Sequence, residues 1–520
     1  MTVNDINPIL KMDYPDPDVI RVGDTYYLVS TTMYFMPGCE ILRSYDLVHW
    51  EHAAFVYDKL DSTPAQRLEG EENIYGQGMW AASLRYHEGS FYVIFVANDT
   101  HKTYLYRADK IEGPWIKSEI EGFYHDNSLL FDEDGRVYIV YGNRSVYLTE
   151  LKSDLSGPKE GGINRLIVKD RDDAYLGYEG AHFYKINGRY YIFFIHMPRE
   201  TGRRTEACFV ADSIDGEFKG GDVCGDDRGY CGSGCAQGGI VDTPDGKWYA
   251  IVFQDSGAVG RIPVLMPVTF KDGADLPVFG TDGKVPLEFE VPDGRPGYVY
   301  EPLAGSDDFK DPAGKKDERF TQSFGFKSFW QFDHEPDMSL VEHDSVNGYV
   351  KISTDKICKN VVQAKNTLTQ RTSYPSCAAQ VTVDGSGLKE GDYAGLCLLE
   401  SAYAFIAITR RDGELYLVMK KRKAPEGMWG ERHDTEAGDE CAAVKLNGSS
   451  AVLRAEADFT MMKDSAAVFY VEDGVKKQLG EECRLVFKLD HFTGVRFGLF
   501  IYSTKECGGS AVFKDFIYEA

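Results

Sequence analysis

The chain has 520 residues and a formal net charge of −25. Its length exceeds what one ordinary hydrophobic core accommodates, so we expect two domains. The excess of negative charge argues against a nucleic-acid backbone or an anionic membrane as the partner, and a neutral ligand fits better. Aromatic residues make up 13% of the chain, which also has 53 glycines and no long segment with helical periodicity. This composition predicts an all-β protein of many short strands.

Five stretches of the first half repeat one pattern, in which a short apolar segment runs through a glycine turn into an aromatic-rich strand. The stretches begin at Asp16, Trp80, Asp126, Glu179 and Gln237. The turns carry Gly23, Gly89, Gly135, Gly188 and Gly246. Such segments are hairpin signals, and they recur at intervals of roughly 45 to 65 residues. This recurrence predicts a five-bladed β-propeller with one four-stranded sheet per repeat.

The first residues of these stretches hold equivalent positions in the repeat. Trp80, Asp126, Glu179 and Gln237 each lie twelve residues before the last tyrosine of the second strand. Asp16 lies eleven residues before its tyrosine because its turn is one residue shorter. Equivalent positions of blades around one axis lie at a similar depth in the central channel, so these five side chains should converge. The register alone therefore predicts an active site in the channel.

The pattern changes after the last repeat. Residues 260–268 form a strand-like run that we expect to complete the fifth blade, and residues 271–315, rich in Gly, Pro and Asp, read as a linker. Short strands follow without a repeat, which favours a β-sandwich of the jelly-roll type over a second propeller. The predicted domains are a catalytic propeller over residues 1–300 and an accessory β-sandwich over residues 308–520.

Signals for export and for disulfide bonds are absent from the sequence. The first residues lack a basic region followed by an apolar core, and no apolar run approaches the ~18 residues of a membrane span, so we expect a cytoplasmic protein. The 11 cysteines are odd in number and scattered, which indicates reduced thiols. Cys224, Cys231 and Cys235 form the densest group, but neither their spacing nor a nearby His supports zinc.

Three of the five register residues are carboxylates, the groups that glycosidic hydrolysis needs. One carboxylic acid protonates the leaving oxygen, and one carboxylate activates water or attacks the sugar. Alone, Asp16 before Pro17 would start a turn, Asp126 would cap a strand end and Glu179 would be solvated. Three carboxylates at the equivalent position of a repeat favour the catalytic hypothesis, and their mutual repulsion would raise the pKa of at least one of them.

Five further side chains are candidates for substrate binding, each with a structural alternative. Trp80 either stacks on a sugar in the channel or belongs to the core. Gln237 either holds a hydroxyl or satisfies neighbouring backbone groups. Arg261 either holds the channel carboxylates or is an exposed loop cation. Met33 and Phe35, in the loop at residues 33–38, either wall the pocket and favour a chain end or form a hydrophobic connection between blades.

Three motifs give the first half a resemblance to glycoside hydrolase family 43. They are Asn7-Pro8-Ile9-Leu10 with Tyr14-Pro15-Asp16-Pro17-Asp18, then Ser44-Tyr45-Asp46-Leu47-Val48-His49-Trp50, then Glu179-Gly180-Ala181-His182. The second half is similar to the β-sandwich that accompanies some members. The resemblance implies a five-bladed propeller that acts with inversion, mostly on arabinosides and xylosides. It implies Asp16 as general base, Glu179 as general acid and Asp126 as the residue that orients the acid and sets its pKa.

Two positions depart from the pattern of that family. Several relatives carry His at the channel position of the fifth blade, tied to a central metal ion or to the sugar, and this chain has Gln237. We therefore expect no required cofactor or metal, and a structural calcium ion is doubtful. Where many relatives have Trp-Ala-Pro, this chain has Trp80-Ala81-Ala82, a difference expected to reshape the floor of the sugar site.

The predicted function is an exo-acting, inverting hydrolase that releases terminal α-L-arabinofuranosyl units from hemicellulose oligosaccharides. A β-xylosidase, or an enzyme with both activities, is the close alternative, because the two sugars present similar hydroxyl patterns. The alternatives of other kinds are a non-catalytic carbohydrate-binding propeller and a retaining enzyme. The expected partners are arabinoside or xyloside oligosaccharides, and the oligomeric state is left open. A loop at residues 424–430 exposes Trp429 beside the pocket or packs it on its own sandwich.

Overall fold

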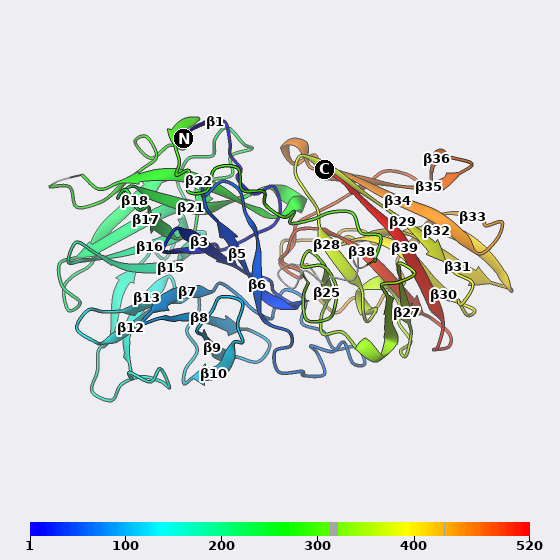
Figure 1. Cartoon of the computed structure of the whole chain (residues 1–520), viewed down its shortest axis with the longest axis horizontal. Coiled ribbons are helices and arrows are strands. Elements are labelled where there is room, and N and C mark those ends of the chain that lie inside the picture. The colour runs from blue at the N-terminus through cyan, green and yellow to red at the C-terminus, as the bar shows by residue number, and fades with distance from the viewer. Residues whose placement is uncertain (272, 311–320, 431) are drawn as a thin grey trace.

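The computed structural model describes residues 1–271, 273–310, 321–430 and 432–520. Within these ranges the chain forms β-strands and short 3₁₀ turns (Gly257–Val259, Met338–Leu340, Val361–Gln363 and Thr460–Met462) but no α-helix, so it offers no helix long and apolar enough to cross a membrane. The strands gather into two bodies that lie side by side, the earlier strands on the left of Figure 1 and the later ones on the right. The all-β prediction is confirmed.

The first body is a propeller of five sheets arranged around an axis (Figure 1). Blade 1 contains β2 (Asp18–Val22), β3 (Thr25–Ser30), β5 (Gly38–Ser44) and β6 (Glu51–Tyr57). Blade 2 contains β7 (Ser83–His87), β8 (Ser90–Ala97), β9 (Lys102–Ala108) and β10 (Ile116–Ile120). Blade 3 contains β11 (Ser128–Phe131), β12 (Val137–Asn143), β13 (Ser145–Leu151) and β14 (Asn164–Lys169).

The remaining blades follow the same order. Blade 4 contains β15 (Leu176–Ile186), β16 (Arg189–Met197), β17 (Thr205–Ala211) and β18 (Lys219–Cys224). Blade 5 contains β19 (Cys235–Ala236), β20 (Ile240–Asp242), β21 (Trp248–Asp255), β22 (Arg261–Thr269) and β23 (Val278–Phe279). The five predicted turn glycines all have a positive φ, between 65° and 83°, which L side chains rarely adopt. The predicted hairpins are therefore confirmed.

The segment predicted to be a linker is partly propeller instead. Strand β23 pairs with β22 and completes blade 5, and β24 (Glu288–Glu290) pairs with β1 (Thr2–Asn4) at the start of the chain. Farther on, Tyr298 donates a hydrogen bond from Oη to Glu51 of blade 1 (2.6 Å). Residues 272 and 311–315 of that segment lie outside the described residues, and the boundaries at 300 and 308 stay a prediction.

The blades are tied together at the axis by the buried carboxylate of Asp18. Its Oδ2 accepts hydrogen bonds from the N–H of Leu84 (2.8 Å) and from Nη1 of Arg85 (2.7 Å), both in blade 2. Its Oδ1 lies 3.0 Å from Nδ1 of His182 in blade 4. Arg85 also donates to the carbonyl oxygen of Leu129 in blade 3 (2.7 Å). Burial opposes ionisation, but Arg85 and His182 hold the pKa of Asp18 below its ordinary value.

Blade 5 closes the ring on both sides. The N–H of Ile240 donates to Oη of Tyr184 in blade 4 (3.0 Å), and the N–H of Gly239 donates to the carbonyl oxygen of Pro17 (2.9 Å), next to blade 1. A Cβ atom at Gly239 would lie 2.9 Å from Oδ1 of Asp18, so a larger residue would displace the central carboxylate.

The second body is a sandwich of two sheets, the architecture predicted for the second half (Figure 1). One sheet contains, in spatial order, β33 (Asp439–Lys445), β32 (Glu414–Lys421), β31 (Ala404–Arg411), β30 (Asp392–Leu399), β38 (Arg496–Ser503), β28 (Leu368–Arg371), β25 (Gln331–Asp333) and β4 (Phe35–Met36). The other contains β26 (Val341–Asp344), β27 (Tyr349–Ser353), β39 (Ser510–Glu519), β29 (Ser376–Asp384), β34 (Ser450–Asp458), β35 (Ser465–Glu472) and β36 (Val475–Gln478), with β37 (Cys483–Arg484) beside β35.

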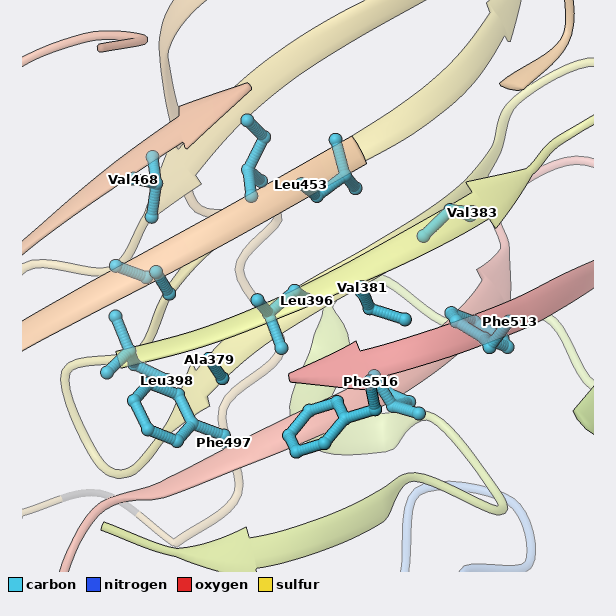
Figure 2. Packing of buried hydrophobic residues seen from close by; sticks show 14 of the residues in the cluster. Ala379, Val381, Val383, Leu396, Leu398, Leu453, Val468, Phe497, Phe513 and Phe516 are labelled. Atoms are coloured by element: carbon cyan, nitrogen blue, oxygen red, sulfur yellow. The ribbon is translucent and has the colours of Figure 1, made fainter. Parts of the chain in front are cut away.

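Apolar side chains of both sheets fill the space between them, as Figure 2 shows. Val381 and Phe513 from one sheet and Leu396 and Phe497 from the other all belong to one fully buried cluster. Burial of each such side chain contributes roughly 1.5–3 kcal/mol, so this cluster is the main source of the sandwich's stability. Side chains of β29 alternate between this core and the more exposed face, as the period of two along a strand requires. Strand β38 is buried along its whole length, because its other face packs in the apolar cluster that contains Phe35.

The two bodies share a sheet and a buried ion pair. Strand β4 leaves blade 1 and pairs with β25, so the propeller supplies the edge strand of one sandwich sheet. Arg371 of the sandwich donates from Nη1 to Oε2 of Glu40 in blade 1 (2.7 Å) and from Nε to the carbonyl oxygen of Asp13 (2.9 Å). Burial opposes ionisation of Glu40, but Arg371 and His52 lower its pKa to about 2. The sandwich is therefore fixed on the propeller by hydrogen bonds as well as by apolar contacts.

The central carboxylate generates the first testable prediction. Asp18→Asn leaves the guanidinium of Arg85 without its buried counter-charge and disturbs the contact with His182, so we expect it to lower the free energy of unfolding by about 3–5 kcal/mol. The matched control is Asp242→Asn, which removes a partly exposed carboxylate paired with Arg21 between blades 1 and 5 and should cost about 0–1 kcal/mol. Urea unfolding followed by tryptophan fluorescence measures both, and equal losses would contradict the central role of Asp18.

Candidate active site

All five register residues approach one another at one end of the channel. Oδ2 of Asp126 accepts a hydrogen bond from the N–H of Gly180 (3.2 Å), which follows Glu179. A Cβ atom at Gly180 would lie 2.5 Å from the side chain of Gln237, so the fourth and fifth blades touch there. On the opposite side, Trp80 packs edge to face against the ring of His125 (5.8 Å between centroids).

Three of the five register positions share an unusual backbone conformation. Asp16, Asp126 and Gln237 have φ of 53°, 48° and 60°, and Gly180, one residue after Glu179, has φ of 63°. The left-handed region is uncommon for residues other than Gly, and such residues concentrate at functional sites. In β15 the register also shifts on both sides of Glu179. Bulges of this kind re-aim a side chain, and here the side chain that is re-aimed is a carboxylate.

Asp16 is held by one cation and one hydroxyl. Its Oδ1 accepts a hydrogen bond from Nη1 of Arg261 (3.0 Å), and its Oδ2 accepts one from Oγ1 of Thr31 (2.7 Å). Asp16 and Arg261 are both almost fully buried. The hypothesis that Arg261 holds a channel carboxylate is therefore correct at the level of contact, and the exposed-cation alternative is wrong.

Asp126, His125 and Glu179 form a compact charged group. Nε2 of His125 lies 3.8 Å from Oδ1 of Asp126 and 3.7 Å from Oε2 of Glu179. Burial raises the pKa of Asp126 to about 7; His125 opposes this rise, and the charges of Glu179 and Asp16 add to it. Burial lowers the pKa of His125, but Asp126 and Glu179 raise it to about 9, so the ring is charged at neutral pH. The group therefore holds a proton near neutrality beside a fixed cation.

Sequence analysis did not identify three side chains of the site: His125, Asn143 and Phe492. His125 precedes Asp126 directly, and a titratable neighbour of a register carboxylate is a signal that could have been used. Asn143, at the end of β12, donates a hydrogen bond from Nδ2 to Oε2 of Glu179. Phe492 gives no sequence signal, because it lies in the second half, hundreds of residues from the repeats.

Phe492 brings the sandwich to the site. Its ring lies 5.7 Å from that of Trp80, edge to face, and 4.5 Å beneath the guanidinium of Arg261. Nη2 of Arg261 also donates to the carbonyl oxygen of Phe492 (3.4 Å). Trp80 is only half-buried, so its register places it at the site rather than wholly in the core. Two aromatic side chains from different domains thus meet beside Arg261, the cation that holds Asp16.

Met33 and Phe35 do not occupy the predicted pocket wall. They are 2% and 1% exposed and belong to an apolar cluster that joins the loop to the sandwich residues Val361, Phe405 and Phe500. The guanidinium of Arg496 covers the ring of Phe35 at 3.4 Å. The contact between the domains buries this loop, so these side chains have almost no exposed surface that could contact a sugar.

One group of described residues has the spacing of a metal site, and it is the group His125, Asp126 and Glu179. Calcium prefers six to eight oxygen ligands, whereas this group offers two carboxylates beside a charged imidazole ring that repels a cation. By itself this group therefore does not fit calcium. Gln237 donates its backbone N–H to Oε2 of Glu206 (2.7 Å), a carboxyl whose pKa burial raises. All eleven cysteines are free, and the three denser ones form no ligand group within the described residues.

Trp429 is exposed, and its loop lies beside the segment that carries Phe492. The side chain is 79% exposed. The N–H of Leu489, three residues before Phe492, donates to the carbonyl oxygen of Met428 (2.9 Å). Of the two alternatives for Trp429, packing on its own sandwich is therefore wrong.

Comparison with known proteins places both halves of the chain. Residues 6–274 match the family model described as glycosyl hydrolases family 43, and residues 319–519 match the model described as beta xylosidase C-terminal concanavalin A-like domain. A beta-xylosidase of Formosa agariphila is 26% identical over 578 residues, which span 99% of this chain and 90% of that protein. A non-reducing end alpha-L-arabinofuranosidase of Bacteroides ovatus is 27% identical over 439 residues, which span 80% of this chain and 78% of that protein.

A solved structure from Bacteroides eggerthii, described as bifunctional GH43-CE, agrees with the whole of this chain at a TM-score of 0.88 and 41% identity. This chain spans 64% of the length of that protein, which is less than two thirds.

The raised pKa of Asp126 generates a prediction on the pH dependence of stability. A carboxyl with a pKa of about 7 in the folded protein and about 3.9 when unfolded costs stability as the pH rises through that window. His125 adds to the trend, because its stabilising charge is lost as the pH rises from about 6.5 through about 9. We therefore compare the free energy of unfolding of the wild type with that of Asp126→Asn. We expect the difference, wild type minus variant, to fall steadily between about pH 5 and pH 9.

Urea unfolding at several pH values measures this difference. The control is Asp134→Asn, on an exposed turn of the same blade, whose pKa Arg136 lowers; its difference from the wild type should stay constant above about pH 5. A constant difference for Asp126→Asn as well would show that Asp126 does not titrate near neutrality.

Proposed function

The chain belongs to glycosyl hydrolase family 43, and from this premise we propose that it releases terminal α-L-arabinofuranosyl units from hemicellulose oligosaccharides with inversion. The observation that carries the proposal is the convergence of Asp16, Asp126 and Glu179 in one channel end. A carbohydrate-binding propeller without catalysis would need aromatic faces and hydrogen bonds but gives no reason to gather three carboxylates. The chain is a glycoside hydrolase, and the sugar it prefers is the part that is proposed.

In the proposed mechanism, Asp16 is the general base. Arg261 and Thr31 hold its two oxygens, so the carboxylate is fixed in one orientation. Asp16 removes a proton from a water molecule as the water oxygen attacks the anomeric carbon. The bond to the leaving oxygen breaks on the opposite face of the sugar, which gives inversion.

Glu179 is the proposed general acid, and Asp126 controls its proton. Oxygen atoms of the two carboxyls lie within 4.8 Å of each other, so two negative charges in this group repel. Burial and the nearby carboxylates raise the pKa of Asp126 to about 7, so Asp126 retains a proton near neutral pH. We propose that this proton reaches the leaving oxygen through Glu179. Asn143 and His125 both contact Oε2 of Glu179, which fixes the direction in which the carboxyl points.

Release of terminal β-xylosyl units is the second candidate. Two observations favour it: the model that matches the second half is described as a beta xylosidase domain, and the Formosa agariphila relative, similar over 99% of this chain, is a beta-xylosidase. The two sugars differ by pocket contacts worth a few kcal/mol at most. Initial rates on aryl α-L-arabinofuranoside and aryl β-xyloside decide between the candidates, and proton NMR of the first product formed decides between inversion and retention.

Replacement of the proposed base and acid should have different signatures. Asp16→Ala should lower kcat/KM by about 10²–10⁴-fold on every substrate, because the water loses its base. Glu179→Ala should lose a similar factor on substrates with poor leaving groups and much less on activated aryl glycosides, whose leaving oxygen needs no proton. The control is Glu133→Ala, an exposed carboxylate of blade 3, which should behave as the wild type. Equal losses on both substrate types would remove Glu179 from the role of acid.

Trp429 is proposed to contact the leaving-group side of an oligosaccharide. Removing one stacked aromatic face costs about 0.5–1.5 kcal/mol, so Trp429→Ala should raise KM for arabinoxylo-oligosaccharides roughly 2- to 12-fold. KM for aryl glycosides should change little, because they have no second sugar to reach the loop. Val346→Ala, a similarly exposed position on a sandwich turn, is the control. If Trp429→Ala changed KM by the same factor for both substrate types, the loop would not contact the oligosaccharide.

A further inference from the structure

The carboxylate of Asp13 joins the two segments that flank the proposed base. Its Oδ1 accepts a hydrogen bond from the N–H of Arg261 in the propeller, and its Oδ2 accepts one from the N–H of Gly494 in the sandwich, both at 2.8 Å. Asp13 is 6% exposed, so water competes little for either oxygen. Charged acceptors make stronger hydrogen bonds than neutral ones, and burial strengthens them further.

The space around this carboxylate is closed by glycines. A Cβ atom at Gly260, next to Arg261, would lie 2.3 Å from Oδ1 of Asp13. A Cβ atom at Gly494 would lie 2.9 Å from Cβ of Asp13 and 2.2 Å from the carbonyl oxygen of Val259. The two backbones can approach the carboxylate this closely only because neither has a side chain there.

Both partners of Asp13 lead directly to the reacting groups. Arg261 uses its guanidinium to hold Asp16 (3.0 Å), and Gly494 lies two residues after Phe492. The carbonyl oxygen of Phe492 accepts from the same guanidinium, and its ring lies beneath it. A shift of either backbone segment would therefore move Arg261 against Asp16, or Phe492 against Trp80.

We propose that Asp13 is a positioning residue of the active site: its carboxylate clamps the strand that carries Arg261 to the sandwich loop that carries Phe492, and so sets the geometry around Asp16. The inference rests on the proposed function of Asp16. Asp13 itself touches none of the reacting groups. Its effect on the reaction passes through Arg261 and Phe492.

Asp13→Asn tests this inference with little change in volume. The amide keeps one oxygen acceptor but turns an NH₂ group toward one of the two backbone N–H donors, so one side of the clamp is lost. Misplacement of catalytic groups by about 1 Å can cost 10²-fold, and we expect kcat/KM for an aryl pentoside to fall by about that factor. Both kcat and KM should change. The value of kcat falls because Asp16 is misplaced, and KM rises because the ring of Phe492 is displaced from the site. Hydrogen exchange of residues 258–262 and 491–495 should become faster.

The matched control is Asp132→Asn. Asp132 is also a buried carboxylate that joins two parts of the fold: it follows β11 of blade 3 and accepts hydrogen bonds from Nζ of Lys185 and Oη of Tyr190 in blade 4. None of these three residues belongs to the clamp. We expect it to lower stability while the folded protein keeps kcat and KM near wild-type values. If Asp13→Asn lowers only the apparent kcat, in proportion to the folded fraction and at unchanged KM, its role is structural and the inference is overturned.

Gly494→Ala keeps the test decisive if Asp13→Asn fails to fold. The added methyl pushes the loop away from Val259 and Asp13 and should also raise KM, so a wild-type KM in a folded Gly494→Ala protein would contradict the clamp. A wild-type protein that turns over neither aryl arabinofuranoside nor aryl xyloside would overturn the proposed function instead. In that case the exchange rates of the two segments in Asp13→Asn still decide whether Asp13 clamps them.

Discussion

The structure depends on one buried carboxylate at the propeller axis. Asp18 accepts hydrogen bonds from blades 2 and 4, and through Arg85 it is connected to blade 3. A ring of blades has no single hydrophobic core, because each pair of sheets buries its own apolar layer. This polar hub, which blades 2 and 4 contact directly and blade 3 contacts through Arg85, fixes these blades at one depth. That common depth brings the first residues of the repeats together near the axis.

The same constraint determines the electrostatics of the site. Bringing the start of each blade to the axis places three carboxylates together, and burial of such a group without counter-charges would be prohibitive. Arg261 balances Asp16, and the imidazolium of His125 balances Asp126 and Glu179. The cations fall short of the carboxylates by one. Burial, together with the neighbouring carboxylates, raises the pKa of Asp126 to about 7, so a proton is retained near neutral pH. In the proposed mechanism this retained proton is the one that the leaving group receives.

The sequence predicted the features that follow from the repeated pattern of the blades. It did not predict the features that depend on how the sandwich docks on the propeller. Register placed Asp16, Asp126 and Glu179 in one site because equivalent residues of a repeat occupy equivalent places. It could not find Phe492, whose approach depends on how the sandwich docks, or Asn143, which lies at the far end of a strand. Met33 and Phe35 were misassigned for the same reason, since only the docked sandwich buries them. The outer strand β23 was read as a linker because two paired residues are too few to form a pattern.

Docking of the sandwich is better explained by the polar contacts than by the apolar ones. The apolar cluster around Phe35 stabilises contact between the domains but is not directional, and a small slide would preserve most of its burial. The same slide would break two buried hydrogen bonds, the one from Arg371 to Glu40 and the one from Gly494 to Asp13. Each would leave a buried charge without its partner, which is costly. Buried ion pairs contribute little net stability compared with apolar packing, and their use at this contact is understandable as a means of setting register. A register fixed to within a hydrogen bond is what a site needs when Arg261 comes from one domain and Phe492 from the other.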